Sequence, residues 1–226
     1  MVLVASPWTS APQGGILSRL IFVATMVKAV VFDLGKVLVN FDYMIAARRI
    51  AARANISAEQ LMAMLVGSPV FPRYERGLIS REQVFEEVRR VSGFQGTMEE
   101  FAVFFGDVFS EIKPMIELQA ALRKGGLATY VFSNTNDLAI EHIRRAFPFF
   151  GNFDGYIFSY EHGLLKPEAG LYEVLERRSG RRGGELLYLD DRPENTQAGA
   201  ARGWGVILHE SPEKSRQAIR NAGLLV

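Results

Sequence analysis

The sequence contains no cysteine and only three histidines among its 226 residues. The absence of cysteine excludes disulfide bridges, thiolate metal sites and cysteine nucleophiles, and it is typical of a reducing compartment, so we expect a cytoplasmic protein. The histidines, His142, His162 and His209, lie far apart and form no HExxH or HxH pattern. This spacing favours surface or packing roles over metal ligation.

An excess of charge of one sign is also missing, because 26 Lys and Arg stand against 25 Asp and Glu. Such a balance gives no electrostatic support for binding nucleic acid, so we expect no nucleic-acid partner. No apolar run reaches the roughly 20 residues that cross a bilayer. The best candidate, residues 15–27, is interrupted by Ser18 and Arg19, and we expect no contact with a membrane.

Residues 1–26 lack the features of a signal peptide. No Lys or Arg precedes the apolar stretch, and no clean cleavage site of small residues follows it. A strand-like segment begins directly after Met26. We therefore expect residues 1–26 to form a flexible N-terminal extension.

The rest of the composition is that of a soluble globular protein, with 48% hydrophobic and 23% charged residues. These values exclude wholesale disorder, collagen-like repeats and a coiled-coil rod. A chain of 226 residues corresponds to about one and a half average domains. The length therefore predicts one sizeable domain with a smaller insertion.

Five short apolar runs each end in a polar or glycine-bearing turn, which is typical of parallel strands covered on both faces. The runs are residues 29–33, 128–133, 156–159, 186–190 and 204–208, and helical patterns between them occupy 115–124, 138–146, 169–178 and 195–202. This alternation predicts a doubly wound α/β core with a parallel sheet, formed by residues 27–42 and 110–226.

Residues 43–109 break the alternation, because they show helical periodicity and no convincing strand. Helices are predicted over 44–54, 57–65, 80–91 and 97–109, three of them opened by the capping-box pairs Ser57 and Gln60, Ser80 and Gln83, and Thr97 and Glu100. The aromatic stripe of Phe101, Phe104, Phe105 and Phe109 has the spacing of a helix face that packs against its neighbours. We interpret this stretch as a small helical module inserted into the α/β core.

Polar side chains close several of the predicted strands, and ligands of open parallel sheets bind beyond this edge. Carboxylates without His or Cys favour a hard cation such as Mg²⁺. A lysine and a Ser-Asn turn suit phosphate oxygens, and an aspartate can attack phosphorus to form an aspartyl-phosphate. The residues in question are Asp33, Ser133, Asn134, Lys166, Asp190 and Asp191.

Four ordered segments resemble the motifs of the haloacid dehalogenase superfamily. They are VFDLGKVL at 31–38, FSNTN at 132–136, KPEA at 166–169 and LDDRPEN at 189–195. The resemblance covers about residues 27–208, and within the superfamily the chain is most similar to a group of bacterial α-D-glucose-1-phosphate phosphatases. It implies hydrolysis of a small phosphorylated metabolite, such as the sugar phosphate glucose 1-phosphate. For the oligomeric state we expect a monomer or a homodimer.

The same resemblance implies a Mg²⁺ site. Asp33 would be both the nucleophile and a metal ligand, and Gly35 would offer its backbone carbonyl to the ion. In the aspartate pair, Asp191 would be the metal ligand, and Asp190 would make an outer or a second contact. Asn195 takes the place of a more distal acidic residue that is common in the family.

For the substrate, the resemblance implies that Ser133 and Asn134 bind the transferring phosphoryl group. Lys166 would neutralise this group and orient Asp33. The helical module over residues 43–109 resembles a cap that closes over the site and shapes substrate choice. A closed cap would exclude competing water from the first step.

One position departs from the family pattern. Most phosphatases of the family place a second Asp, the general acid, two residues after the nucleophile, where this chain has Gly35. General acid–base catalysis is typically worth about 10²–10⁴-fold. The chain is then either an enzyme whose leaving group needs little protonation or is protonated by another group or by water, or a phospholigand-binding or regulatory protein with an inactive site. Asp42, which ends the first motif region, is expected to act as a hinge or cap-entry residue.

Dehalogenation of 2-haloacids is a third possibility that the superfamily name raises. Dehalogenases need no metal and lack the paired aspartates of the fourth motif. In this chain Asp190 and Asp191 would place uncompensated negative charge beside Asp33 unless a cation lay between them. The pair therefore favours Mg²⁺ and argues against dehalogenation.

Overall fold

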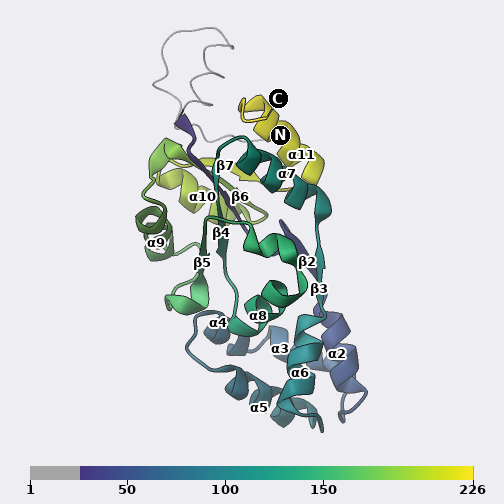
Figure 1. Cartoon of the computed structure of the whole chain (residues 1–226). Helices are drawn as coiled ribbons and strands as arrows, with labels where there is room; N and C mark the ends of the chain where they lie inside the picture. The colour runs from purple at the N-terminus through teal and green to yellow at the C-terminus, as the bar shows by residue number, and fades with distance from the viewer. Residues whose placement is uncertain (1–25, 226) are drawn as a thin grey trace.

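The computed structural model describes residues 26–225. The extension predicted over residues 1–26 lies outside this range, apart from Met26. The described chain forms an α/β part built on a parallel sheet and a group of helices beyond one end of that sheet (Figure 1). No helix within residues 26–225 is long and apolar enough to cross a bilayer.

The central sheet has five strands, all parallel, in the order β5-β4-β1-β6-β7. The strands are β1 (Ala29–Phe32), β4 (Ala128–Ser133), β5 (Gly155–Phe158), β6 (Leu186–Asp190) and β7 (Gly205–Leu208), each within one residue of its prediction. Phe32 of β1 pairs with Val131 of β4 and with Leu189 of β6. This register places the carboxyl ends of the three central strands at the same edge.

Helices cover both faces of the sheet, as the side chains of β1 show. Val30 and Phe32 point into a hydrophobic core shared with α7 (Lys113–Lys124), α8 (Asp137–Ala146) and α11 (Pro212–Asn221). Ala29 and Val31 point into a second core shared with α9 (Ala169–Ser179) and α10 (Pro193–Ala201). The predicted doubly wound α/β fold is therefore confirmed. Short 3₁₀ helices occupy Pro148–Gly151, Ser159–Glu161 and Gly183–Glu185.

Five helices follow the first strand and form a hydrophobic core of their own. They are α2 (Tyr43–Ala51), α3 (Ala58–Val66), α4 (Val70–Glu75), α5 (Arg81–Ser92) and α6 (Met98–Gly106). The chain enters them through β2 (Val39–Phe41) and leaves through β3 (Phe109–Glu111), and these two strands pair antiparallel. Leu138 and Ala139 of α8 join this core and link it to the α/β part. Figure 1 shows the five helices together at the end of the molecule opposite α11.

The predicted capping boxes at Ser57, Ser80 and Thr97 are all formed. Some predicted boundaries are wrong. The helix predicted over 44–54 ends at Ala51, and the one predicted over 97–109 ends at Gly106.

Phe109 is a strand residue, because it pairs with Phe41 in the β2–β3 ribbon. Within the aromatic stripe, Phe101 and Phe105 are buried in the helical core as predicted, and Phe104 packs partly buried against it. The aromatic spacing alone did not distinguish a last helical turn from the first residue of a strand.

Candidate active site

Carboxylates from two neighbouring strands meet at the carboxyl edge of the sheet. Asp33 directly follows β1, Asp190 ends β6, and Asp191 follows it. One oxygen atom of each of these three side chains lies within 4.8 Å of the others. The parallel register of β1 and β6 explains this convergence, because both strands end at the same level.

Lys166 brings a positive charge into this cluster from the loop between β5 and α9. Its buried Nζ atom donates hydrogen bonds to Asp33 Oδ1 at 2.9 Å, to Asp190 Oδ2 at 2.7 Å and to the Phe132 carbonyl at 2.9 Å. Burial favours the neutral amine, but the two carboxylates outweigh it and raise the pKa of Lys166. The ammonium is therefore charged and fixed in direct contact with Asp33.

Asp190 is completely buried, and both of its oxygens accept hydrogen bonds from neighbouring protein groups. Besides Lys166, the donors are the Tyr188 hydroxyl, the Arg192 backbone N–H at 2.8 Å and Asn195 Nδ2 at 3.0 and 3.1 Å. Burial opposes ionisation, but the charge of Lys166 and these hydrogen bonds lower the pKa of Asp190. This carboxylate therefore positions Lys166, and both of its oxygens are already in use.

Asp33 differs from Asp190 in that one of its oxygens is available. Oδ1 accepts from the Leu34 N–H at 2.7 Å and from Lys166, whereas Oδ2 has no hydrogen-bond partner in residues 26–225. Burial raises the pKa of Asp33 to about 7, and the charge of Asp190 adds to this effect against the opposing charge of Lys166. Burial and the charge of Asp190 also raise the pKa of Asp191.

These carboxylates fit a divalent cation. Three carboxylates and one ammonium leave a net charge of −2 when all are ionised. Burial, and after it the charge of Asp190, raises the pKa values of Asp33 and Asp191. Oxygen donors of this kind suit Mg²⁺. Nearby, Asn195 Oδ1 is buried without a partner among the described residues, as expected of an acceptor beside a hydrated ion.

The Ser-Asn turn after β4 lies against the Lys166 loop. The side-chain amide of Asn134 makes two hydrogen bonds to the backbone of Lys166. Its Nδ2 donates to the Lys166 carbonyl at 3.1 Å, and its Oδ1 accepts from the Lys166 N–H at 2.7 Å. Ser133 is buried at the strand end, and its Oγ donates to the Asn134 carbonyl at 3.2 Å. The structure thus brings both residues to the site, and it uses the Asn134 side chain to hold Lys166 in place.

Gly35 follows Asp33 by two residues, and a side chain at this position would meet the ring of Phe41. A Cβ atom there would lie 2.9 Å from Cε1 of Phe41, the last residue of β2. Asp42 lies outside the carboxylate cluster, because its side chain caps α2 by accepting from the Met44 N–H at 2.9 Å. This contact agrees with the predicted role of Asp42 at the entry to the helices.

Two contributions were not predicted from the sequence. Tyr188 hydrogen-bonds Asp190 from two residues earlier on the same face of β6, an i, i+2 spacing that could have indicated it. Glu168, two residues after Lys166, pairs with Arg76 at the end of α4. No local pattern marks that contact, because its partners are 92 residues apart.

Comparisons with known proteins agree with this geometry. A family model of haloacid dehalogenase-like hydrolases matches residues 27–203. A sesquiterpene phosphatase of Aspergillus oryzae is 27% identical over 188 residues, which are 82% of this chain and 90% of that protein. A D-ribitol-5-phosphate phosphatase of Bacteroides thetaiotaomicron is 24% identical over 201 residues, or 86% and 97% of the two chains.

A solved structure shows the same fold at lower identity. It is a HAD family enzyme of Bacteroides thetaiotaomicron in complex with magnesium and inorganic phosphate, with a TM-score of 0.68 and 21% identity. The match covers 80% of this chain and 93% of that one. As the four sequence motifs predicted, the chain belongs to the haloacid dehalogenase-like hydrolase family.

Proposed function

We propose that the protein is a Mg²⁺-dependent phosphatase that hydrolyses a phosphate monoester of a small metabolite through Asp33. The observation that carries the proposal is the contact between Lys166 and a nucleophile carboxylate that keeps one oxygen available. The phosphatases among the relatives support the same reaction class. Three clustered carboxylates also argue against dehalogenation, which involves no metal to offset their charge.

The reaction proceeds in two displacements at phosphorus. Asp33 Oδ2 attacks the phosphorus atom, and the bond to the ester oxygen breaks. The departing oxygen takes a proton from a water molecule, so that the alcohol leaves and an aspartyl-phosphate forms. Water then attacks the same phosphorus atom, which releases inorganic phosphate and regenerates Asp33. Lys166 holds Asp33 in position and offsets negative charge beside the transferring group.

The carboxylates of Asp33 and Asp191 and the backbone carbonyl of Gly35 would hold the Mg²⁺ ion. The ion supplies positive charge against the phosphoryl oxygens when bound. Asp190 contributes indirectly, because its oxygens keep Lys166 charged and oriented. Ser133 and the backbone of the turn at Asn134 would contact the phosphoryl group.

Substrate identity is the finer part of the proposal. The resemblance to glucose-1-phosphate phosphatases predicts a sugar phosphate, whereas the named relatives include a polyol-phosphate phosphatase and a sesquiterpene phosphatase. We propose that residues 43–109 act as a cap that makes this choice, above a core formed by 27–42 and 110–226. Action in the cytoplasm and a monomeric or homodimeric state stay predictions.

Release of inorganic phosphate from a panel of phosphorylated metabolites tests the proposal. We expect turnover with Mg²⁺, none after chelation with EDTA, and none in Asp33→Asn. Asp42→Asn is the matched control, because Asn also caps helices well and residue 42 lies outside the carboxylate cluster. Binding of panel members without any phosphate release would instead support the phospholigand-binding alternative that Gly35 raises.

A further inference from the structure

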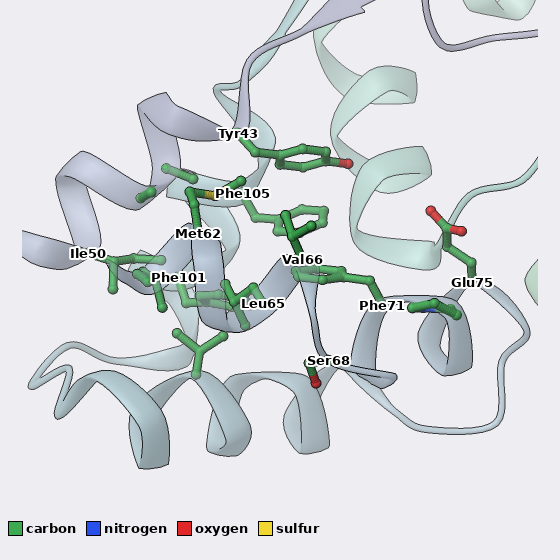
Figure 2. A pocket seen from close by; sticks show the side chains of 15 residues that line it. Tyr43, Ile50, Met62, Leu65, Val66, Ser68, Phe71, Glu75, Phe101 and Phe105 are labelled. Carbon is green, nitrogen blue, oxygen red and sulfur yellow. The ribbon is translucent and has the colours of Figure 1, made fainter. Parts of the chain in front are cut away.

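The helical part of the molecule contains an apolar cavity of about 240 Å³. Helices α2, α3, α4, α5 and α6 all contribute to its lining. Of its fifteen lining residues, only Tyr43, Ser68 and Glu75 carry a polar side-chain atom. Figure 2 shows that the Tyr43 hydroxyl and the Glu75 carboxylate lie at the same end of the cavity, whereas Ile50 and Phe101 lie toward the other end.

Aromatic side chains connect the Tyr43 end of the cavity to the loop that follows β1 and contains Gly35. The ring of Phe41 covers Gly35, and its centroid lies 5.3 Å from the centroid of the Tyr43 ring. The Tyr43 ring in turn lies 5.6 Å from Phe105 and 6.3 Å from Phe71, both of which line the cavity. A row of aromatic side chains therefore leads from the backbone beside Asp33 into the apolar space.

At the same end of the cavity (Figure 2), the backbone of Glu75 is linked through Ser159 to the turn after β4. The Glu75 carbonyl accepts a hydrogen bond of 2.6 Å from Ser159 Oγ. Ser159 Oγ in turn accepts a hydrogen bond of 2.9 Å from the N–H of Thr135, one residue after Asn134. Burial raises the pKa of Glu75, and the positive charges of Arg192 and Lys166 partly offset this effect. The Glu75 carboxyl therefore lies close enough to these two cations to interact with them electrostatically.

We propose that this cavity binds the apolar part of the substrate's alcohol, so that the physiological substrate is the monophosphate of an alkyl or alkenyl alcohol. The inference rests on the proposed phosphatase activity and names its substrate class. In this binding mode the phosphoryl group lies at Asp33, and the carbon chain extends past Phe71 and Phe105 into the cavity.

The lining argues for this class against a sugar. A hexose or a polyol buries a hydroxyl on nearly every carbon, and each buried hydroxyl needs a partner. In the described structure the cavity presents no Lys, Arg, Asp, Asn or Gln side chain, and its apolar residues cannot hydrogen-bond. Binding sites that hold apolar groups are lined in this way, with a few polar atoms at one end.

A series of n-alkyl phosphates from ethyl to octyl tests the inference, with glucose 1-phosphate and ribitol 5-phosphate alongside. Burial of one methylene group corresponds to about fourfold in kcat/KM, so we expect kcat/KM to rise by about that factor per carbon until the cavity is full. The two sugar-type substrates are expected to fall near or below ethyl phosphate.

Two substitutions on α3 form a matched pair. Met62 lines the cavity, whereas Met64 is half exposed on the same helix and does not line it. Met62→Gln places a polar amide in the apolar space and is expected to flatten the dependence of kcat/KM on chain length. Met64→Gln is expected to keep the wild-type dependence.

Binding supplies a second measurement that does not depend on turnover. Calorimetric titration of the Mg²⁺-loaded protein with ethyl- and hexylphosphonate, which are not hydrolysed, is expected to show much tighter binding of hexylphosphonate in wild type and Met64→Gln, but not in Met62→Gln. Phosphate release that does not depend on chain length, or that favours the sugar phosphates, would overturn the inference and leave the phosphatase proposal standing. No phosphate release from any substrate would instead overturn the proposed function.

Discussion

At the scale of single residues, the site is organised by one buried lysine between two carboxylates of different character. Asp190 is saturated with hydrogen bonds and has a lowered pKa, whereas Asp33 has a free oxygen and a pKa raised to about 7. The difference follows from the donors around each carboxylate. It supports the proposal that Asp190 holds Lys166 in place and that Asp33 is the nucleophile.

The raised pKa of Asp33 predicts that Mg²⁺ binding depends on pH. Below about pH 7 the metal-free site holds a proton on Asp33, which Mg²⁺ must displace. We expect Mg²⁺ affinity to rise up to about tenfold per pH unit between about pH 5 and pH 7 and to level off above. Isothermal titration calorimetry in buffers of different ionisation enthalpy measures both the affinity and the released proton.

The raised pKa of Asp33 also makes the stability of the metal-free protein fall as pH rises. The pKa of Asp33 lies above its ordinary value of 3.8, so in the metal-free protein this group costs stability as pH rises from about 4 to 7. Mg²⁺ should remove that cost, and Asp33→Asn should lack both effects. A Mg²⁺ affinity that stays flat from about pH 5 to pH 8 would contradict the account.

Gly35 leads to a prediction about restoring the family's missing acid. Gly35→Asp is expected to destabilise the protein by about 1–3 kcal/mol and to bring no gain in phosphate release, because its Cβ atom would lie 2.9 Å from the Phe41 ring. Urea unfolding of this variant, of Phe41→Ala and of the double variant measures the clash. We expect the double variant to lose less free energy of unfolding than the losses of the two single variants added together. Wild-type stability with increased turnover in Gly35→Asp would show that the ring does not restrict this position.

Much of the site at this scale was predictable, because parallel strands end at a common edge. Asp33, Lys166 and Asp190 were expected there from their places after apolar runs, and the structure brings them into contact. The hydrogen bond from Tyr188 and the bracing of the Lys166 loop by Asn134 were not predicted. Both depend on which way a side chain points, and residue order does not determine this.

At the scale of elements, α4 and α5 are attached to the α/β part by a small set of polar contacts. Arg81 at the start of α5 donates to Asp137 at 2.6 Å and to Glu141 at 2.8 Å, both on α8. Tyr74 of α4 also hydrogen-bonds Asp137, and Arg76 pairs with Glu168. These contacts hold the helix that carries Glu75 against the loop that carries Lys166.

Arg81→Ala is expected to loosen this attachment. The partly buried, charge-assisted hydrogen bonds of Arg81 predict a loss of about 1–2 kcal/mol and faster amide hydrogen exchange in α4 and α5. Arg90→Ala on the same helix is the control, because Arg90 is 70% exposed and pairs only with Glu87, three residues before it. Equal exchange rates in the two variants would show that Arg81 does not hold these helices in place.

The sequence predicted the strands better than the connections between the two parts. The five sheet strands showed continuous apolar runs, and three helices showed capping boxes that the structure confirms. Helix α4 was missed because its six residues include a proline and are too few to show a period. Strands β2 and β3 were missed because three-residue strands take their stability from pairing with each other across the inserted helices.

At the scale of the whole molecule, the α/β part and the helical part contact each other beside the candidate active site. The α/β part supplies the carboxylates at the carboxyl edge of the sheet and Lys166 from a loop, and the helices supply the apolar cavity and Glu75. The order of motifs and the insertion between the first two sheet strands were readable from the sequence. The cavity was not, because its lining comes from five helices whose relative packing no local pattern encodes.

Direct detection of a phosphorylated Asp33 tests the central claim. The Mg²⁺-loaded protein is mixed with hexyl phosphate, quenched in acid during turnover and reduced with borohydride, which converts an acyl phosphate of aspartate to homoserine. Mass spectrometry of the peptide that contains residue 33 is predicted to show homoserine at that position in wild type and in Asp42→Asn, and never without substrate. Sustained phosphate release with an unmodified residue 33, or with the modification on another residue, would contradict the account.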